Sequence, residues 1–160
     1  MGGPPLTSTL GTKKEQLVKS VFNLRQFIVV VLLVSIWVNT SEVFRYFVIV
    51  MPETRAFLSM VPDIAPMNWP VFFIWGAWDT LLTATIVFIF WLVAQVFGNN
   101  LRSVFIAGIA SWASFFVLFW VGMCNMSLAQ PKIALVALPL ALLETIVAAY
   151  FSSRLYARSV

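Results

Sequence analysis

The chain has 160 residues, of which 61% are hydrophobic and 10% are charged, and it contains 15 phenylalanines and 7 tryptophans. Such a composition excludes an ordinary water-soluble domain and is typical of a polytopic membrane protein. The net charge of +4 does not indicate a nucleic-acid partner, because basic cytoplasmic loops beside anionic lipid headgroups produce the same excess.

The N-terminal region precedes the first apolar run. Residues 1–11 are rich in Gly, Pro, Ser and Thr and predict a flexible tail, so that residues 12–160 form the single domain. Thr12 and Glu15 have the spacing of a capping box, which predicts a helix start. Apolar residues between 17 and 22 recur at helical spacing, so this helix either lies at the cytoplasmic interface or extends the first span.

Four apolar runs follow, each about the length that crosses a bilayer. They cover about 27–50, 71–97, 101–123 and 133–151. The turns at 98–100 and 125–131 are short, so consecutive helices must be antiparallel. Residues 51–70 contain four prolines and predict an ordered external loop with a short helix around 56–60. The expected fold is all-α, an integral membrane antiparallel four-helix bundle.

The basic residues predict the orientation of the bundle. One side has seven of them, at positions 13, 14, 19, 25, 102, 154 and 158, whereas the other side has only Arg55 and Lys132. Because positive charge favours the cytoplasmic side, we expect both termini to face the cytoplasm. The expected location is the cytoplasmic (inner) membrane or another cellular membrane.

Each predicted span carries one stripe of small or polar residues at helical spacing. The stripes are Ser35, Asn39, Glu42 and Tyr46; Gly76, Asp79 and Thr83; Ala107, Ser111 and Ser114; and Ala137, Ala141, Glu144, Ala148 and Ser152. The structural interpretation is that small residues allow close packing and hydroxyl groups form hydrogen bonds between helices, for about 0.5–2 kcal/mol each.

Ionisable residues inside the spans are more informative, because a charge at the bilayer centre costs about 2.5–3.5 kcal/mol or more. The rise per residue predicts that Glu42, Arg45 and Asp79 meet in the outer half of the membrane, with Glu42 roughly 12 Å below the external end of its helix, while Glu144 lies deeper, near Ser111. Three carboxyls then face one guanidinium. Protonation, a bound cation or water must neutralise the difference, and each indicates function.

Structural alternatives remain open for these residues. Glu42 and Arg45 could form an i, i+3 ion pair that only orients the helix. Asp79 could cap a neighbouring helix or bond to nearby Trp and Thr side chains. Glu144 could be a protonated carboxyl bonded to Ser111, or to backbone freed by a proline in the fourth span.

Two tryptophans accompany Asp79 in the second span. Trp75 and Trp78 are four residues and one residue away, so we expect at least one of them to share its face. Aromatic walls around a carboxylate form a pocket suited to a lipophilic cation. The alternative is that the rings only fill the bundle and contact lipid.

The sequence contains few of the residues that usually bind metals and haem. Cys124 is the only cysteine, which excludes an internal disulfide, and the absence of histidine removes the commonest ligand of haem and transition metals. We expect no cofactor and no metal site.

In outline, the architecture resembles two known groups. Four short spans with an embedded glutamate, here Glu42, are similar to the small multidrug-resistance transporters, which exchange protons for lipophilic cations. An acid late in the first span, a proline-rich loop and an acid in the second span, here Asp79, resemble the sterol isomerase and sigma-2 receptor group. Glu42 lies later than in the first family, and the histidine used by the isomerases is missing. The resemblance concerns architecture alone.

The leading hypothesis is a membrane binding or transport protein for a small lipophilic or cationic ligand, with protons on Asp79 or Glu144 as candidates for exchange. Four helices enclose little volume, so we expect a homo-oligomer or a membrane-complex partner. The alternatives are an intramembrane acid/base enzyme acting on a lipid or isoprenoid, and a structural subunit or assembly factor. The candidate ligand-binding residues are Asn39, Glu42, Arg45, Tyr46, Trp75, Trp78, Asp79, Thr83, Ser111, Ser114 and Glu144.

Overall fold

The computed structural model describes residues 22–157, and its regular structure in this range is entirely helical. The all-α prediction is therefore confirmed. The tail at 1–11, the capping box of Thr12 and Glu15 and the proposed interfacial helix lie in the part of the chain outside these residues, apart from Phe22.

The elements are α2 (Leu24–Arg45), the π-helical turn η1 (Tyr46–Val50), α3 (Met51–Phe57), α4 (Trp69–Phe97), α5 (Leu101–Trp112), the π-helical turn η2 (Ala113–Val117), α6 (Leu118–Asn125) and α7 (Pro131–Ala157).

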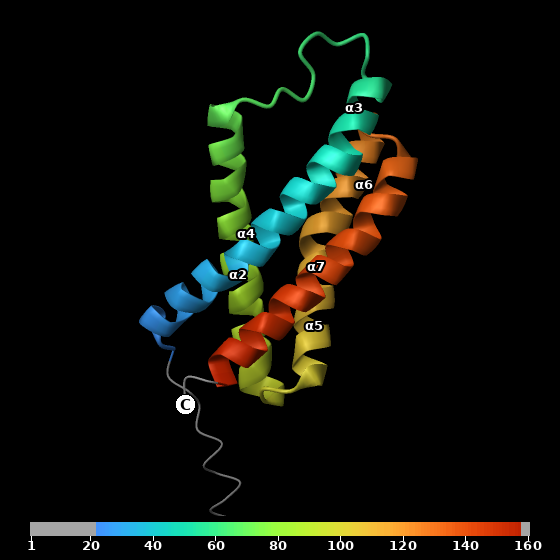
Figure 1. The fold of residues 1–160 in the computed structure, drawn as a ribbon. Helices are drawn as coiled ribbons and strands as arrows, with labels where there is room; N and C mark the ends of the chain where they lie inside the picture. The colour runs from blue at the N-terminus through green and yellow to red at the C-terminus, as the bar shows by residue number, and fades with distance from the viewer. Residues whose placement is uncertain (1–21, 158–160) are drawn as a thin grey trace, which may run out of the picture.

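These elements join into four long helices, because α2 continues through η1 into α3, and α5 continues through η2 into α6 (Figure 1). The beginning of α2 and the end of α7 lie at the same end of the bundle (Figure 1). All four helices are long and apolar enough to cross a membrane, as in a multi-pass membrane protein.

Asparagine caps determine where three of the helices begin. The side chains of Asn23, Asn68 and Asn100 accept hydrogen bonds from backbone N–H groups three residues later, at 3.0–3.1 Å. Each cap satisfies a donor that the first helical turn leaves free. Gly98 ends α4 with a φ of 80°, a conformation that glycine adopts readily, and lets the chain reverse into α5.

The first long helix is longer than predicted. We expected residues 51–70 to be a loop with a helix at 56–60, but α3 occupies Met51–Phe57 and the connection is shorter. Pro52 does not end the helix because it follows η1, where the Met51 N–H donates to the Tyr46 carbonyl and the backbone hydrogen-bond pattern is already shifted. The proline falls in the first turn of α3, where its missing N–H costs least.

The core consists of three separate apolar clusters and is lined with small residues along α7, which contacts α2, α4 and α5. The predicted α7 stripe is fully buried, from Ala137 to Ser152. Gly108 of α5 makes the closest helix approach: a Cβ at this position would lie 2.9 Å from the Ile146 Cα. Small residues at the interface thus allow the backbones of α5 and α7 to meet.

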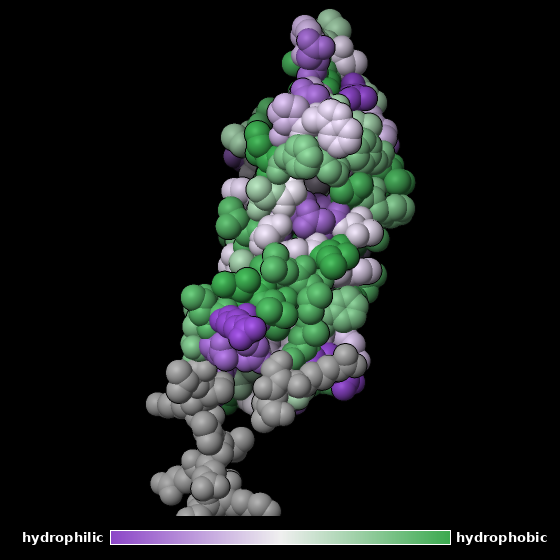
Figure 2. Space-filling model, turned by 60° about the vertical axis from the view of Figure 1, so that its left-hand side comes forward, coloured by the Kyte–Doolittle hydropathy of each residue, from purple (hydrophilic) through white to green (hydrophobic). Residues whose placement is uncertain are grey.

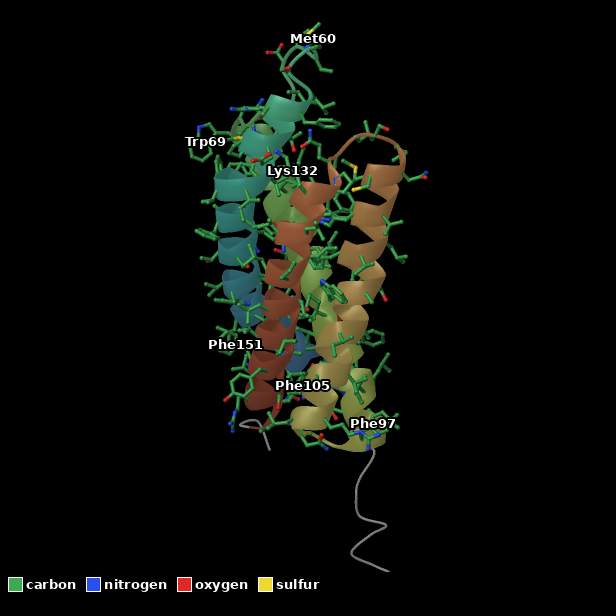
Figure 3. The ribbon with its side chains drawn as sticks, turned by 90° about the vertical axis from the view of Figure 1, so that its right-hand side faces the viewer. Met60, Trp69, Phe97, Phe105, Lys132 and Phe151 are labelled. Atoms are coloured by element: carbon green, nitrogen blue, oxygen red, sulfur yellow. The ribbon has the colours of Figure 1, made fainter. Side chains whose placement is uncertain are left out.

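The two halves of α4 differ in their packing. Residues 79–90 include five buried side chains, among them Ile86 and Phe90, whereas residues 69–78 include none. In Figure 1, the first half of α4 stands apart from α3 and α6, while its second half lies within the bundle. Figure 3 places Trp69 and Lys132 toward one end of the molecule and Phe97 toward the other.

Candidate functional site

Charged side chains from two helices meet at the centre of the bundle. Arg45 of α2 pairs with Glu42, one helical turn earlier, and its Nη1 also lies 3.4 Å from Glu144 Oε2 of α7. Ser41 Oγ donates to the same Glu144 oxygen at 2.7 Å. We call Ser41, Glu42, Arg45 and Glu144 the Arg45 cluster. The predicted contact between Glu42 and Arg45 is confirmed.

Aromatic residues support the Arg45 cluster. The guanidinium of Arg45 lies over the Phe116 ring, 4.7 Å from its centroid, in a cation–π arrangement. Trp37 Nε1 donates to the Glu144 backbone carbonyl at 3.2 Å. On the other side of α7, Trp112 Nε1 donates to the Leu138 carbonyl at 2.8 Å, just before Pro139. These contacts hold α7 at a fixed height against its neighbours.

Three helix irregularities surround the cluster. The π-helical turn η1 follows Arg45 directly, η2 carries Phe116, and Pro139 interrupts the α7 hydrogen-bond pattern five residues before Glu144. Both π-helical turns contact α7. Single π-helical turns occur frequently at functional sites, and the proline frees a backbone carbonyl inside the bundle. This part of the bundle is therefore its least regular and most polar part.

The predicted depths of the acids were wrong. We expected Glu42 and Arg45 in the outer half and Glu144 deeper, but all three belong to one cluster. Glu144 is the middle residue of α7, and Glu42 lies about 22 Å from the end of α3 at Phe57. The error arose because the first helix continues seven residues beyond the predicted end at Val50, so its outer half is longer than assumed.

Asp79 lies near the cluster but outside it. Its residue is buried, and its electrostatic neighbours are Glu42 and Arg45. Its backbone carbonyl accepts a hydrogen bond from Thr83 Oγ1 at 2.7 Å, and Thr83 is fully buried. Asn39 of α2 contacts α4 one turn before Asp79, because a Cβ on Gly76 would approach Asn39 Oδ1 to 3.5 Å. Asp79 thus lies close to the contact between α2 and α4.

Three predicted site residues point away from the interior. Trp75 and Trp78 are 50% and 61% exposed, whereas Asp79 is 7% exposed, so neither ring is enclosed with the Asp79 carboxyl in the bundle. The reason is that the first half of α4 has no buried side chain. Ser111 is buried but Ser114 is exposed, because η2 begins between them and shifts the face of the helix. Tyr46 is half-buried and begins η1.

A second stripe on α2, which we did not predict, supplies the contacts to Glu144. Trp37, Ser41 and Arg45 are each four residues apart, and all three bond to Glu144 through its backbone or its carboxyl. The signal was present in the sequence as a regular spacing of four. It was missed because the adjacent stripe of Ser35, Asn39 and Glu42 appeared more polar.

Four buried side-chain oxygens have no hydrogen-bond partner among residues 22–157. Two of them are Glu144 Oε1 in the cluster and Ser111 Oγ of α5, and both residues are fully buried. The bond that we considered between these two side chains is therefore not formed. An unsatisfied buried oxygen is costly, so each of these atoms needs an explanation.

The cluster reaches the surface on one side. The Glu42 side chain is 19% exposed, against 7% for Arg45 and 0% for Glu144. Figure 2 shows one face of the molecule, which is largely apolar and carries a hydrophilic patch about midway along its height. A carboxylate that is only partly enclosed, on an otherwise apolar surface, is accessible to a cation from outside the bundle.

Comparison with protein-family models, curated proteins and solved structures found no match to this chain. The function must therefore be inferred from the site itself. Within residues 22–157, no three side chains of Asp, Glu, His or Cys converge closely enough to hold a metal ion. The chemistry offered by the cluster is ion pairing, hydrogen bonding and proton exchange.

Proposed function

We propose that this chain is a membrane protein that binds or transports a small lipophilic cation, with its four long helices spanning the cytoplasmic (inner) membrane. The distribution of basic residues supports an orientation with both termini in the cytoplasm. In this arrangement the Arg45 cluster lies near the middle of the bilayer, where a ligand can arrive through the lipid.

The observation that carries the proposal is the charge imbalance. Glu42, Glu144 and Asp79 are electrostatic neighbours of a single guanidinium, that of Arg45, inside an apolar bundle. Intramembrane charges are rare and usually mark a pathway or a binding site. A cationic ligand beside Glu42 would compensate one of the excess carboxylates, which a purely structural ion pair does not need.

The surface around Glu42 suits such a ligand. Glu42 is the cluster member most open to the outside, and Asn39 and Gly76 close the contact between α2 and α4 beside it. Beyond Gly76, the first half of α4 offers unpacked apolar and aromatic surface. The cationic group of the ligand would pair with Glu42, with Asp79 nearby, and its apolar body would lie against this part of α4.

Binding of tetraphenylphosphonium to the protein in lipid nanodiscs tests the proposal. We expect Glu42→Gln to weaken binding about tenfold or more, because the ligand loses its direct ion pair, and Asp79→Asn to weaken it less. Glu53→Gln is the matched control, since Glu53 is an acid paired with Lys132 in the outer part of the molecule. Equal binding by wild type and Glu42→Gln, or no saturable binding by wild type, would contradict the proposal.

A second candidate function is that of a structural subunit in a larger membrane complex or a homo-oligomer. The observation that favours it is the unpacked first half of α4, where Trp69 stacks on Phe73 and both rings are exposed. Helix surfaces of this kind can be covered by a partner helix as well as by lipid. Purification from native membranes in a mild detergent separates the two functions, because a stoichiometric partner would support the structural role.

A further inference from the structure

The unpaired oxygen of Glu144 suggests a second role within the proposed cation site. Glu144 Oε2 accepts from Ser41 and faces Arg45, whereas Oε1 has no partner among the described residues. A carboxylate inside an apolar bundle should have both oxygens satisfied, because each unpaired oxygen loses its hydration without compensation. A proton on Oε1 removes this cost by removing the charge.

Ser111 supplies an oxygen at the same height. Gly108 of α5 lies against Ile146 of α7, and the two helices are antiparallel. Counting from this close approach, Ser111 lies level with residue 143, one residue from Glu144. Ser111 Oγ is also buried and unpartnered within residues 22–157. Two buried, unpartnered oxygens therefore occur at about one level of the bundle, one on α7 and one on α5.

Arg45 connects this level to the cation site. Its guanidinium pairs with Glu42 and lies 3.4 Å from Glu144, so it is shared between the two side chains. The charged and titratable groups that face Glu144 are Glu42 and Arg45 from α2 and Asp79 from α4. Ser111 and Phe116 are the cluster neighbours from the third long helix, and neither carries a charge.

We propose that Glu144 is the proton-exchange site of this protein, so that one proton leaves Glu144 when one cation binds at Glu42. This inference rests on the proposed function. When the cation pairs with Glu42, Arg45 is released toward Glu144. The proton on Oε1 then passes to water, and the Glu144 carboxylate pairs with Arg45. One positive charge enters and one leaves, so the net charge inside the bundle does not change.

The experiment measures proton release and cation affinity together. Tetraphenylphosphonium is added to weakly buffered protein in nanodiscs with a pH indicator, and binding is repeated across pH. Wild type should release about one proton per bound cation, and its affinity should rise by up to about tenfold per pH unit. Glu144→Gln should release no proton, and whatever affinity it keeps through Glu42 and Asp79 should not depend on pH. Glu53→Gln should behave as wild type.

Infrared spectroscopy of the ligand-free protein provides a second readout. A protonated carboxyl band should be present in wild type at neutral pH and absent in Glu144→Gln. The inference is wrong if Glu144→Gln binds the cation and still releases a proton, or if its ligand-free spectrum matches that of wild type. The proposed cation site at Glu42 is unaffected by either result. If wild type does not bind the cation, the proposed function is wrong, and the carboxyl band alone decides whether Glu144 carries a proton.

Discussion

The two halves of α4 are similarly apolar but differ in what surrounds them. Residues 79–90 pack against α2, α5 and α7 through Ile86, Val87 and Phe90, whereas residues 69–78 expose their side chains. The polar residues mark the change, because Asp79 and Thr83 are buried at its start. Apolar residues thus do not reveal whether a helix face meets protein or lipid, whereas small and polar ones do.

The difference also explains why the Arg45 cluster is enclosed on one side only. The packed half of α4, with α5 and α7, closes the bundle around Glu144. The unpacked half leaves Glu42 partly open. A site that is closed on one side and partly open on the other is the arrangement expected of the proposed cation site, and four sets of variants test this comparison.

The largest expected effect concerns the charge cluster itself. Arg45→Gln leaves Glu42 without its counter-charge, and breaking a buried ion pair from one side costs about 3–5 kcal/mol. Thermal unfolding in detergent should therefore shift strongly, and the double variant Arg45→Gln with Glu42→Gln should recover part of the loss. The control is Arg55→Gln, whose side chain donates to the Ala65 carbonyl in an exposed loop. If Arg45→Gln and Arg55→Gln unfold at the same temperature, the Arg45 cluster does not stabilise the bundle.

The comparison within α4 is tested by replacing one isoleucine with alanine in each half of the helix. Ile86 is fully buried and Ile74 is 69% exposed. Ile86→Ala should lower the unfolding free energy by about 2–5 kcal/mol, because it leaves a cavity. Ile74→Ala should change it by no more than about 0.5 kcal/mol. Unfolding in mixed detergent micelles measures both, and a comparable loss for Ile74→Ala would mean that the first half of α4 packs more tightly than described.

The close approach of α5 and α7 should give a smaller effect. Gly108→Ala places a Cβ 2.9 Å from the Ile146 backbone, so the helices must separate, at a cost of about 1–3 kcal/mol. Gly122→Ala is the matched control, because a Cβ there meets nothing within 4 Å. The same unfolding assay distinguishes them. A neutral Gly108→Ala variant would indicate that this part of the packed region can relax easily.

The smallest effect on stability is expected at the tryptophans of the unpacked half. Removing the rings of Trp75 or Trp78 should change the unfolding free energy by no more than about 0.5 kcal/mol, because both are largely exposed. Their contact with lipid is measurable by another route. In variants that retain a single tryptophan, brominated phospholipids should quench Trp75 and Trp78 strongly and the buried Trp120 weakly. Strong protection of Trp75 in native membranes would instead favour a partner on α4.

Within residues 22–157, the sequence alone determined the four long apolar helices, their antiparallel order and the buried stripe of α7. Long apolar runs can only be helices when the backbone must satisfy its own hydrogen bonds, and short turns leave few topologies. The small residues from Ala137 to Ser152 predicted their burial because only small side chains permit close helix contact. The pair of Glu42 and Arg45 followed from a spacing of three.

Only the tertiary structure decided which charges meet. The depth of a residue in the bundle depends on where its helix ends. Because the π-helical turn precedes Pro52, the first long helix ends at Phe57, seven residues after the predicted end at Val50. Glu42 and Arg45 therefore lie at the level of Glu144. A similar turn after Ser111 turned Ser114 outward. The exposure of Trp75 depends on how far α4 diverges from its neighbours. Contacts between helices depend on small shifts in register and tilt, which the spacing of residues along one helix does not specify.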